Sequence, residues 1–327
     1  MAHKIGILGA GGWGTTLALH CVRRGHAVTL WEVFPKYADE LRTRRENIRY
    51  LPGFPLPTSL AITSSLADVC DHSHLLILAV PSVHLRRILR RFRRRYAGAP
   101  VLIATKGLEI ATGNTMSAVF DVEIPGAARA VLSGPNIARE IAAGFPAAAV
   151  AASSRPRTAL LFQEALSDAI LRIYSSADED GVQLGGALKN IYAIGAGVID
   201  GLGLGSNTKA SYLTRALREM TTLGARWGGK ERTFSGLSGM GDLITTSFSP
   251  SSRNRSFGEA LAKGTADTFL HTAMAIEGIP ATRSVCRRVR REKIEAPIAR
   301  TVERIVFSRS DPRDELRLLM HRTLKRE

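Results

Sequence analysis

The sequence predicts an α/β protein: a doubly wound, mostly parallel sheet in residues 1–177, followed by an all-α C-terminal domain in residues 178–327. Three observations support this prediction. Short apolar runs alternate with segments of helical periodicity up to residue 177, and a glycine-rich turn joins the first run to the first helical segment. Beyond residue 178 only helical patterns continue. A chain of 327 residues is long enough for two such domains.

The glycine-rich turn follows the apolar run 5–8 and has the pattern Gly9-x-Gly11-x-x-Gly14. In a strand–turn–helix unit the first glycine allows a tight turn and the second lets a pyrophosphate approach the backbone. The third lets the helix pack closely on the strand. Free N–H groups at the start of a helix over 15–22 would bind the phosphates. The turn therefore predicts a Rossmann domain with a dinucleotide site.

Glu32 ends the second apolar run, 26–31, and strengthens this prediction. A carboxylate about twenty residues beyond the first glycine binds the ribose 2′-OH of the adenosine. Because the same carboxylate repels a 2′-phosphate, we expect NAD rather than NADP. Arg42, Arg44 and Arg45 lie close enough in the sequence to weaken that preference, so NADP stays open.

The remaining elements of the first domain are expected to alternate in the same way. Helical spacing predicts helices over 35–45, 66–69, 85–95, 114–120 and 155–166. Apolar runs predict strands over 60–63, 74–80, 100–104, 128–132, 147–152 and 171–175. The proline-rich segment 51–57 is expected to be a loop.

The chain carries a formal net charge of +16, which points to an anionic partner. Nucleic acid, an acidic membrane surface and a phosphorylated substrate all qualify. The densest positive run, 85–95, places its apolar residues at helical spacing and its arginines on the opposite face. We interpret this face as the solvated back of a helix. Weak attraction to a membrane surface is the alternative, and no specific nucleic acid is expected.

Three scattered cysteines, Cys21, Cys70 and Cys286, show neither paired nor metal-binding spacing. This usage is typical of free thiols in a reducing compartment. We expect no signal peptide, because the first apolar run belongs to the glycine-rich turn unit, and no membrane span, because the apolar stretches 141–152 and 181–199 are too short or too interrupted. We expect a soluble, cytoplasmic protein without a metal site.

Two lysines are candidates for catalysis. Lys106 directly follows the run 100–104, and ligands bind beyond the carboxyl ends of parallel strands, so we expect it to face the cofactor. Lys189 is the only charged residue from Gly181 to Ile199, which predicts a mostly buried helix. Buried lysines are rare and prone to a lowered pKa, which suits acid–base catalysis.

Two later segments supply further polar groups. Asp242 is the one carboxylate in the glycine-rich segment 236–244. Ser252, Arg253 and Asn254 offer a hydroxyl, a guanidinium fork and an amide in succession. Because arginine pairs bidentately with phosphate oxygens, these three residues predict a phosphate-binding site.

Taken together, these motifs resemble the bacterial-type NAD(P)-dependent glycerol-3-phosphate dehydrogenases. The resemblance runs from the first strand to about Glu277. It rests on six segments in chain order: Gly9-x-Gly11-x-x-Gly14, residues 104–109, Ser133-Gly134-Pro135, residues 181–190, residues 239–243 and residues 252–255. The helix with Lys189 and the Ser-Arg-Asn-Arg segment are the most specific of them.

The resemblance implies an oxidoreductase that interconverts dihydroxyacetone phosphate and sn-glycerol 3-phosphate with NAD or NADP and supplies the phospholipid backbone. It implies that Lys189 is the general acid/base, Lys106 the second active-site lysine and Asp242 the acidic residue beside them. The implied substrate contacts are Lys106, Gly134, Asn136, Lys189, Asp242, Ser252, Arg253 and Asn254. The implied cofactor contacts are Gly9, Gly11, Gly12, Trp13, Gly14, Glu32, Lys106, Ala138, Arg253 and Glu277. Asn136 stands where the family usually has a residue with a hydroxyl group. The resemblance also leaves a homodimer open.

Two other functions stay open. The first is another lysine-dependent Rossmann dehydrogenase, acting on a small 3-hydroxy acid or a phosphosugar. Such relatives usually place an asparagine one helical turn after the lysine, where this chain has Ala193. The second is a non-catalytic, basic, dinucleotide-sensing protein bound to nucleic acid or membrane. That function explains the net charge and the run 85–95, but not the helix with Lys189.

Overall fold

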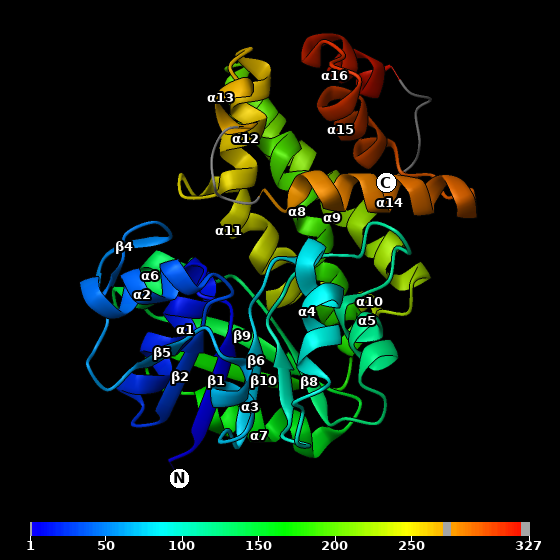
Figure 1. Ribbon diagram of the computed structural model, residues 1–327. Helices are drawn as coiled ribbons and strands as arrows, with labels where there is room; N and C mark the ends of the chain where they lie inside the picture. The colour runs from blue at the N-terminus through cyan, green and yellow to red at the C-terminus, as the bar shows by residue number, and fades with distance from the viewer. Residues whose placement is uncertain (1, 271–275, 322–327) are drawn as a thin grey trace.

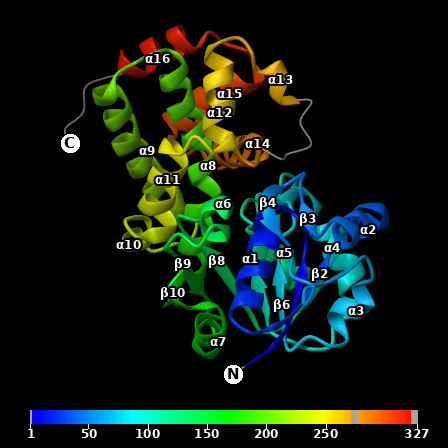
Figure 2. The same ribbon diagram turned by 90° about the vertical axis from the view of Figure 1, so that its left-hand side faces the viewer.

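The computed structural model describes residues 2–270 and 276–321. In Figure 1 the sheet and its helices form the lower half of the molecule and a group of helices forms the upper half. The carboxyl ends of the parallel strands point toward the helical half, as the quarter turn in Figure 2 also shows. The predicted fold class is confirmed.

A sheet of eight strands has the order β10-β9-β8-β7-β6-β1-β2-β5. Its strands are β1 (Lys4–Leu8), β2 (Ala27–Trp31), β5 (Ala61–Thr63), β6 (Leu75–Leu78), β7 (Val101–Ile103), β8 (Arg129–Ser133), β9 (Ala147–Ala152) and β10 (Leu171–Ser176). All neighbours are parallel except β8 and β9. The chain order reverses at β1, between β2 and β6, and such a reversal marks the ligand-binding edge of an open sheet.

Helices cover both faces of this sheet. One apolar core lies under α1 (Gly12–Arg23), α2 (Pro35–Arg44) and α7 (Pro156–Leu166). The other lies under α3 (Leu66–Cys70), α4 (Leu85–Phe92) and α5 (Met116–Glu123). The short helices η1 (Ser82–His84) and α6 (Ala138–Ala142) follow β6 and β8. The three cysteines are buried free thiols.

Three predicted elements differ in the structure. Residues 51–57 are not all loop, because β4 (Leu51–Pro55) pairs with β3 (Glu46–Asn47) in an antiparallel hairpin. A two-stranded hairpin tolerates proline, since each edge leaves N–H groups unused. The helix predicted over 85–95 ends at Phe92, the last apolar residue of its buried stripe. The helix predicted over 114–120 runs from Met116 to Glu123, because Thr115 caps it.

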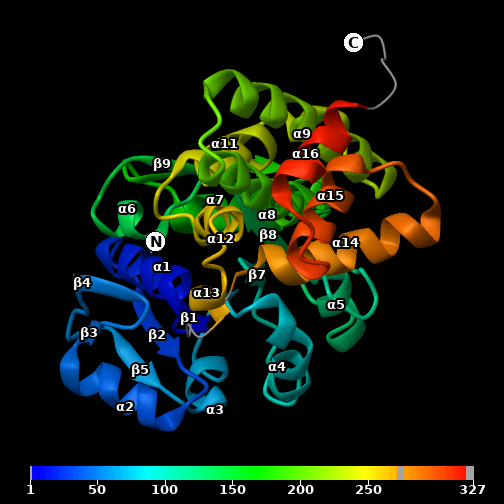
Figure 3. The same ribbon diagram turned by 90° about the horizontal axis from the view of Figure 1, so that it is seen from above.

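The sheet ends at Ser176, and the residues described after it form helices. They are α8 (Glu179–Gly201), α9 (Ser206–Arg226), α10 (Glu231–Phe234), η2 (Leu237–Gly241), α11 (Asp242–Phe248), α12 (Arg253–Ala262), α13 (Asp267–Leu270), α14 (Gly278–Glu292), α15 (Pro297–Phe307) and α16 (Pro312–Met320). Figure 3 shows them from above. Helix α14 contacts the loop before α5, because Oγ of Ser284 donates a hydrogen bond to the carbonyl oxygen of Glu109 at 3.2 Å. Across the described ranges, no helix combines the length and the apolar character needed to cross a lipid bilayer.

Helix α8 forms the centre of the helical half. The side chain of Asp178 caps its first turn by accepting a hydrogen bond from the backbone N–H of Gly181 at 3.1 Å. Three glycines bring α8 against α12: a Cβ on Gly197, Gly201 or Gly258 would collide with backbone atoms of the other helix. This close approach fixes α12, with its predicted phosphate-binding residues, relative to the helix that carries Lys189.

Candidate active site

Lys189 and Asp242 form an ion pair between α8 and α11. Nζ of Lys189 donates to Oδ1 of Asp242 at 2.8 Å and to Oγ1 of Thr246 at 2.5 Å. Lys189 is 8% exposed and Asp242 is 1% exposed, so the pair lies away from bulk water. The structure therefore brings together two residues that the sequence analysis selected from separate segments.

The π-helical turn η2 places Asp242 against α8. A Cβ on Gly185 of α8 would collide with the carbonyl oxygen of Ser238 in η2, so only glycine allows the two backbones to approach this closely. Single π turns interrupt the regular register of a helix and are frequent at functional sites. Here the interruption directs the Asp242 carboxylate toward Lys189.

Lys106 reaches the same carboxylate from the sheet. Its Nζ donates to Oδ2 of Asp242 at 2.6 Å and to the carbonyl oxygen of Gly134 at 3.0 Å. Lys106 follows β7 and Gly134 follows β8, so both lie beyond the carboxyl ends of their strands. Asp242 thus joins two ammonium groups that come from the two halves of the chain.

Burial and neighbouring charges shift the pKa values of this cluster. Removal from water lowers the pKa of Lys189 to about 8, with the Asp242 charge opposing the shift and the Lys106 charge adding to it. Burial alone would raise the pKa of Asp242, but Lys106 and Lys189 hold it below its ordinary value. Lys189 is therefore an ammonium that can give up a proton near neutral pH, beside a carboxylate that stays charged.

Thr246 belongs to this cluster and was not found by the sequence analysis. Its hydroxyl accepts a hydrogen bond from Lys189 and also lies 3.3 Å from Oδ1 of Asp242. Thr246 comes one helical turn after Asp242 on α11, so the two side chains share a face. That spacing was the available signal, but it indicates an active-site residue only when Asp242 is already known to point inward.

The N-terminus of α12 presents the residues predicted to bind phosphate. Ser252 is the N-cap, and its Oγ accepts a backbone hydrogen bond from the first turn at 3.3 Å. Nδ2 of Asn254 donates to Oδ1 of Asn190 at 2.8 Å, and Oδ1 of Asn254 accepts from the backbone N–H of Gly278 at 2.9 Å. The second Nδ2 proton is left for a ligand. Because Asn190 follows Lys189 in α8, this link fixes the phosphate-binding residues relative to the lysine.

Arg253 is exposed at the first turn of α12, and its side chain makes no hydrogen bond or ion pair with any residue in the described parts of the chain. Its charge adds to the lowering of the Lys189 pKa. It also opposes the burial that raises the pKa of Glu277. Arg253 is thus near both groups, with its guanidinium fork available to an anion.

Glu277 connects the helical half to the sheet. Its Oε2 accepts a hydrogen bond from Oγ of Ser82, just beyond β6, at 2.7 Å. A Cβ on Gly107, whose φ is +139°, would lie 2.8 Å from the same Oγ. The glycine after Lys106 therefore leaves room for the Ser82–Glu277 contact.

The segment after β8 carries the other predicted contacts. Nδ2 of Asn136 donates to the carbonyl oxygen of Ala148 at 2.9 Å, while its buried Oδ1 has no partner among the residues described. The carbonyl oxygen of Ala138 accepts from Oγ1 of Thr16 at 3.1 Å, which ties this segment to α1. Asn136 therefore offers an acceptor in place of the hydroxyl group implied by the resemblance.

The glycine-rich turn leaves the space that a pyrophosphate requires. No atom lies within 4 Å of a Cβ placed on Gly11, whereas a Cβ on Gly14 would collide with the carbonyl oxygen of Gly9. The first turn of α1 has no side-chain cap and no acidic residue, so its N–H groups are open to an anion. The buried Nε1 of Trp13 has no partner within the described ranges. These features fit a dinucleotide.

The β3–β4 hairpin lies against the glycine-rich turn. Nδ2 of Asn47 donates to the carbonyl oxygen of Ala10 at 2.8 Å. A Cβ on Gly12 would lie 2.9 Å from the carbonyl oxygen of Tyr50, so glycine is needed at this position too. The sequence analysis assigned part of this hairpin to a loop and therefore missed its contact with the turn.

Glu32 directly follows β2 beside the glycine-rich turn and is 7% exposed. Its Oε1 accepts a hydrogen bond from the backbone N–H of Phe34 at 3.0 Å. Burial raises the pKa of Glu32, while backbone N–H groups and the charge of Arg49 oppose the rise. Arg49 comes from the hairpin and was not considered in the sequence analysis.

The three arginines expected to weaken the NAD preference are occupied elsewhere. Arg42 pairs with Asp39, and Arg44 pairs with Glu40 at 3.1 Å. Arg45 donates to the carbonyl oxygens of Pro57 and Leu60. Arg49 thus replaces them as the cation that acts on Glu32.

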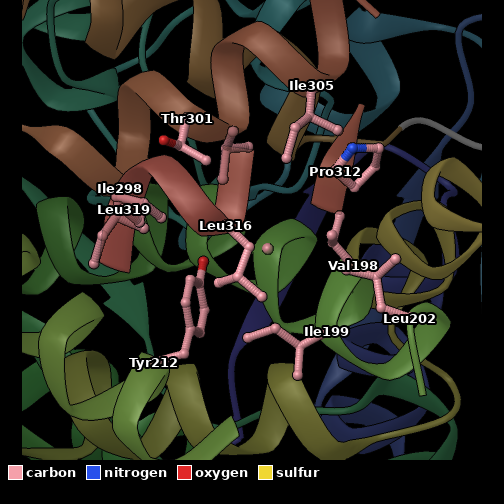
Figure 4. A pocket seen from close by; sticks show the side chains of 12 residues that line it. Val198, Ile199, Leu202, Tyr212, Ile298, Thr301, Ile305, Pro312, Leu316 and Leu319 are labelled. Atoms are coloured by element: carbon pink, nitrogen blue, oxygen red, sulfur yellow. The ribbon is translucent and has the colours of Figure 1, made fainter. Parts of the chain in front are cut away.

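A separate, apolar pocket lies between α8, α9, α15 and α16 (Figure 4). Its volume is about 30 Å³, too small for a dinucleotide or a sugar phosphate. The described residues hold no group of three His, Cys, Asp or Glu side chains able to bind a metal ion. The Lys189 cluster remains the candidate active site, because it brings two lysines and a carboxylate together.

Comparisons with known proteins agree with this arrangement. Sequence profiles for the NAD-dependent glycerol-3-phosphate dehydrogenase N-terminus and C-terminus match residues 4–159 and 178–317. A glycerol-3-phosphate dehydrogenase [NAD(P)+] of Syntrophotalea carbinolica is 42% identical over 99% of both chains. One of Geobacter sulfurreducens is 40% identical over 100% of this chain and 99% of its own.

A solved structure supports the same family. The crystal structure of glycerol-3-phosphate dehydrogenase from Coxiella burnetii superposes with a TM-score of 0.94 at 36% identity, covering 98% of this chain and 99% of that one. The resemblance drawn from the sequence motifs is confirmed. The chain belongs to the family of NAD-dependent glycerol-3-phosphate dehydrogenases.

Proposed function

We propose that the protein interconverts dihydroxyacetone phosphate and sn-glycerol 3-phosphate with an NAD(P) cofactor, and so supplies the backbone of phospholipids. The names of its relatives support this reaction. The observation that carries it is the Lys106–Asp242–Lys189 array, which holds a buried ammonium of lowered pKa where the two halves of the chain meet.

The proton chemistry is assigned to Lys189. A bound dinucleotide supplies the hydride for reduction and accepts it in oxidation. During reduction the Lys189 ammonium gives its proton from Nζ to the ketone oxygen, and during oxidation the neutral amine takes it back. Lys106 adds positive charge where that oxygen becomes negative. Asp242 holds both ammonium groups in position and keeps Lys189 protonated at neutral pH.

Substrate recognition is assigned to the start of α12. The Arg253 fork would bind two phosphate oxygens, and the unused Nδ2 proton of Asn254 would bind a third. Ser252 contributes its backbone and hydroxyl at the same turn. The acceptor on Asn136 and the backbone at Gly134 and Ala138 would contact the ligands from the sheet.

NAD is the proposed preferred cofactor. Glu32 is placed for a ribose 2′-OH and would repel a 2′-phosphate. Arg49 opposes this preference for NAD, because its positive charge acts on the Glu32 carboxylate. A comparison of kcat/KM for NADH and NADPH tests this preference, and a higher value for NADPH would overturn it.

One assay tests the reaction itself. Adding dihydroxyacetone phosphate to the protein and NADH should consume NADH absorbance, and Lys189→Ala should abolish nearly all of the signal. The unphosphorylated ketone should react poorly with wild type. No NADH oxidation by the folded wild-type protein would refute the proposed reaction.

We also propose a division into domains at residue 177, a cytoplasmic location and a homodimer. The end of the sheet at Ser176 and the start of α8 at Glu179 support the division. Free buried thiols suit a reducing compartment. Ile244 and Phe248, exposed one turn apart on α11, are apolar surface that a second subunit could cover. Light scattering on the purified protein would measure its mass and test the dimer.

A further inference from the structure

The strongest positive feature outside the candidate active site is α4 and the turn that follows it. Leu85, Ile88, Leu89 and Phe92 of α4 are buried against the sheet. Its exposed residues form what we call the arginine face, which consists of Arg87, Arg90, Arg91, Arg93, Arg94 and Arg95. The proposed reaction uses none of these residues.

The arginine face is only partly neutralised. Glu123 of α5 pairs with Arg90 at 3.3 Å and with Arg93 at 3.5 Å, and it also pairs with Arg86 at 2.8 Å. A single carboxylate thus serves three guanidinium groups. The side chains of the remaining four, Arg87, Arg91, Arg94 and Arg95, form no hydrogen bond or ion pair with any residue of the ranges 2–270 and 276–321. Such a surplus of one sign on one surface attracts an anionic partner.

Two exposed apolar side chains flank the arginine face. Val83, in the turn before α4, is 52% exposed. Val122, 64% exposed, directly precedes Glu123 on α5, the helix that is joined to α4 by the ion pairs of Glu123. Apolar side chains next to cations suit the boundary between lipid headgroups and acyl chains.

We propose that the arginine face docks the protein reversibly on an anionic phospholipid surface. Docking would be peripheral, because the apolar side of α4 is committed to the core and cannot enter a bilayer. The attraction would be mostly electrostatic and would weaken with salt.

The surroundings of the arginine face favour lipid over nucleic acid. Proteins that bind single-stranded nucleic acid add aromatic side chains on which bases stack. Phe92, the aromatic residue of α4, is 0% exposed, and the hydroxyl of the neighbouring Tyr96 is buried. The exposed apolar side chains in the neighbouring η1 and α5 are the two valines instead. The proposal that the protein binds lipid depends only on this surface. The purpose of that binding, release of a glycerol phosphate at a lipid surface, rests on the proposed function.

Vesicle co-sedimentation tests the proposal. We expect wild-type protein to bind mixed vesicles of phosphatidylglycerol and phosphatidylcholine at low salt and to dissociate from them at high salt. It should not bind vesicles of pure phosphatidylcholine. The variant with Arg87→Gln, Arg91→Gln, Arg94→Gln and Arg95→Gln should bind roughly 10²–10³-fold more weakly, given the attraction expected for each basic residue near such a surface.

A matched control removes the same charge elsewhere. Arg157, Arg218, Arg226 and Arg232 are also exposed and form no ion pair with described residues, so their replacement by Gln changes the net charge equally. This control should lose less than tenfold. Equal loss in both variants, no binding by wild type, or tighter binding to RNA than to anionic vesicles would each overturn the proposal.

Activity in solution separates this test from that of the proposed function. Both four-arginine variants should reduce dihydroxyacetone phosphate as fast as wild type when no vesicles are present. A wild-type protein that is fully active but does not bind the anionic vesicles would therefore reject the docking surface alone. Lipid binding by a protein that shows no activity rejects the proposed reaction alone.

Discussion

The glycine-rich turn at α1 is built from backbone, whereas the Lys189 cluster is built from charged side chains. At the turn the important property is a missing Cβ, which leaves Gly11 open and lets Gly14 pack on Gly9. At the cluster each charge is stabilised by another, with Asp242 held between Lys106 and Lys189. Changes at the turn should therefore act sterically at every pH, and changes at the cluster should depend on pH.

The largest effect is expected from Lys189→Ala. Loss of a positioned acid should lower turnover roughly 10²–10⁴-fold. Lys209 is a suitable control, because it is also 8% exposed and pairs with a carboxylate, that of Asp200, at 2.8 Å. Steady-state kinetics of Lys209→Ala should stay within about tenfold of wild type. Similar losses of turnover in the two variants would mean that Lys189 contributes no more to catalysis than a lysine in an ordinary buried ion pair.

Asp242→Asn should have the next largest effect. Breaking a buried pair by removing one partner costs roughly 3–5 kcal/mol, because an uncompensated charge stays buried. Since the Asp242 charge raises the pKa of Lys189, its loss should also lower that pKa below about 8. Urea unfolding measures the first change and a pH–rate profile the second. A stable variant with an unshifted profile would contradict the coupling.

The pH dependence of wild type follows from the same lysine. Reduction needs the ammonium, so its kcat should fall about tenfold per pH unit as the pH rises through about 8, the pKa of Lys189. Oxidation needs the neutral amine and should become faster over the same interval. Initial rates in both directions over roughly pH 6 to 10, an interval that brackets the Lys189 pKa of about 8, test this contrast. Parallel profiles would be inconsistent with a single acid/base.

Paired glycine substitutions test the other side of the comparison. Gly14→Ala introduces a collision and should destabilise the fold by about 1–3 kcal/mol. Gly11→Ala meets no atom and should leave stability within about 0.5 kcal/mol, yet raise the KM for the cofactor. Calorimetry and cofactor titrations at two pH values distinguish the pair. A loss of stability or of cofactor affinity that changed with pH would show that the glycine substitutions do not act by steric effects alone.

Glu32→Gln should have the smallest effect. A weakened hydrogen bond to the ribose costs about 0.5–1.5 kcal/mol, so NADH should bind only several-fold more weakly. Removal of the negative charge should at the same time improve NADPH. The ratio of the two kcat/KM values is the measurement, and an unchanged ratio would mean that Glu32 does not select the cofactor.

The sequence predicted the turn more completely than the cluster for a physical reason. Gly9, Gly11 and Gly14 lie within one local unit, so spacing alone defines their geometry. Lys189, Asp242 and Thr246 meet only after η2 packs on α8, and no local pattern encodes that contact. The charge at Lys189 and the isolated carboxylate of Asp242 were visible in the sequence, but their distance was not.

Contacts between distant segments were the least predictable. The Ser82–Glu277 hydrogen bond joins residues 195 positions apart. The β3–β4 hairpin escaped prediction because its prolines resemble those of a loop, although its pairing with Glu46 and Asn47 places it on the glycine-rich turn. Arg49, which the hairpin carries, could therefore not be assigned to Glu32 from the sequence.

A crystal structure with dihydroxyacetone phosphate and the dinucleotide bound would test the central claim most directly. The decisive quantity is the distance from Nζ of Lys189 to the carbonyl oxygen, which should be about 2.6–3.2 Å, with Arg253 on the phosphate. A carbonyl oxygen held by other groups, with Lys189 beyond hydrogen-bonding reach of it, would contradict the assignment.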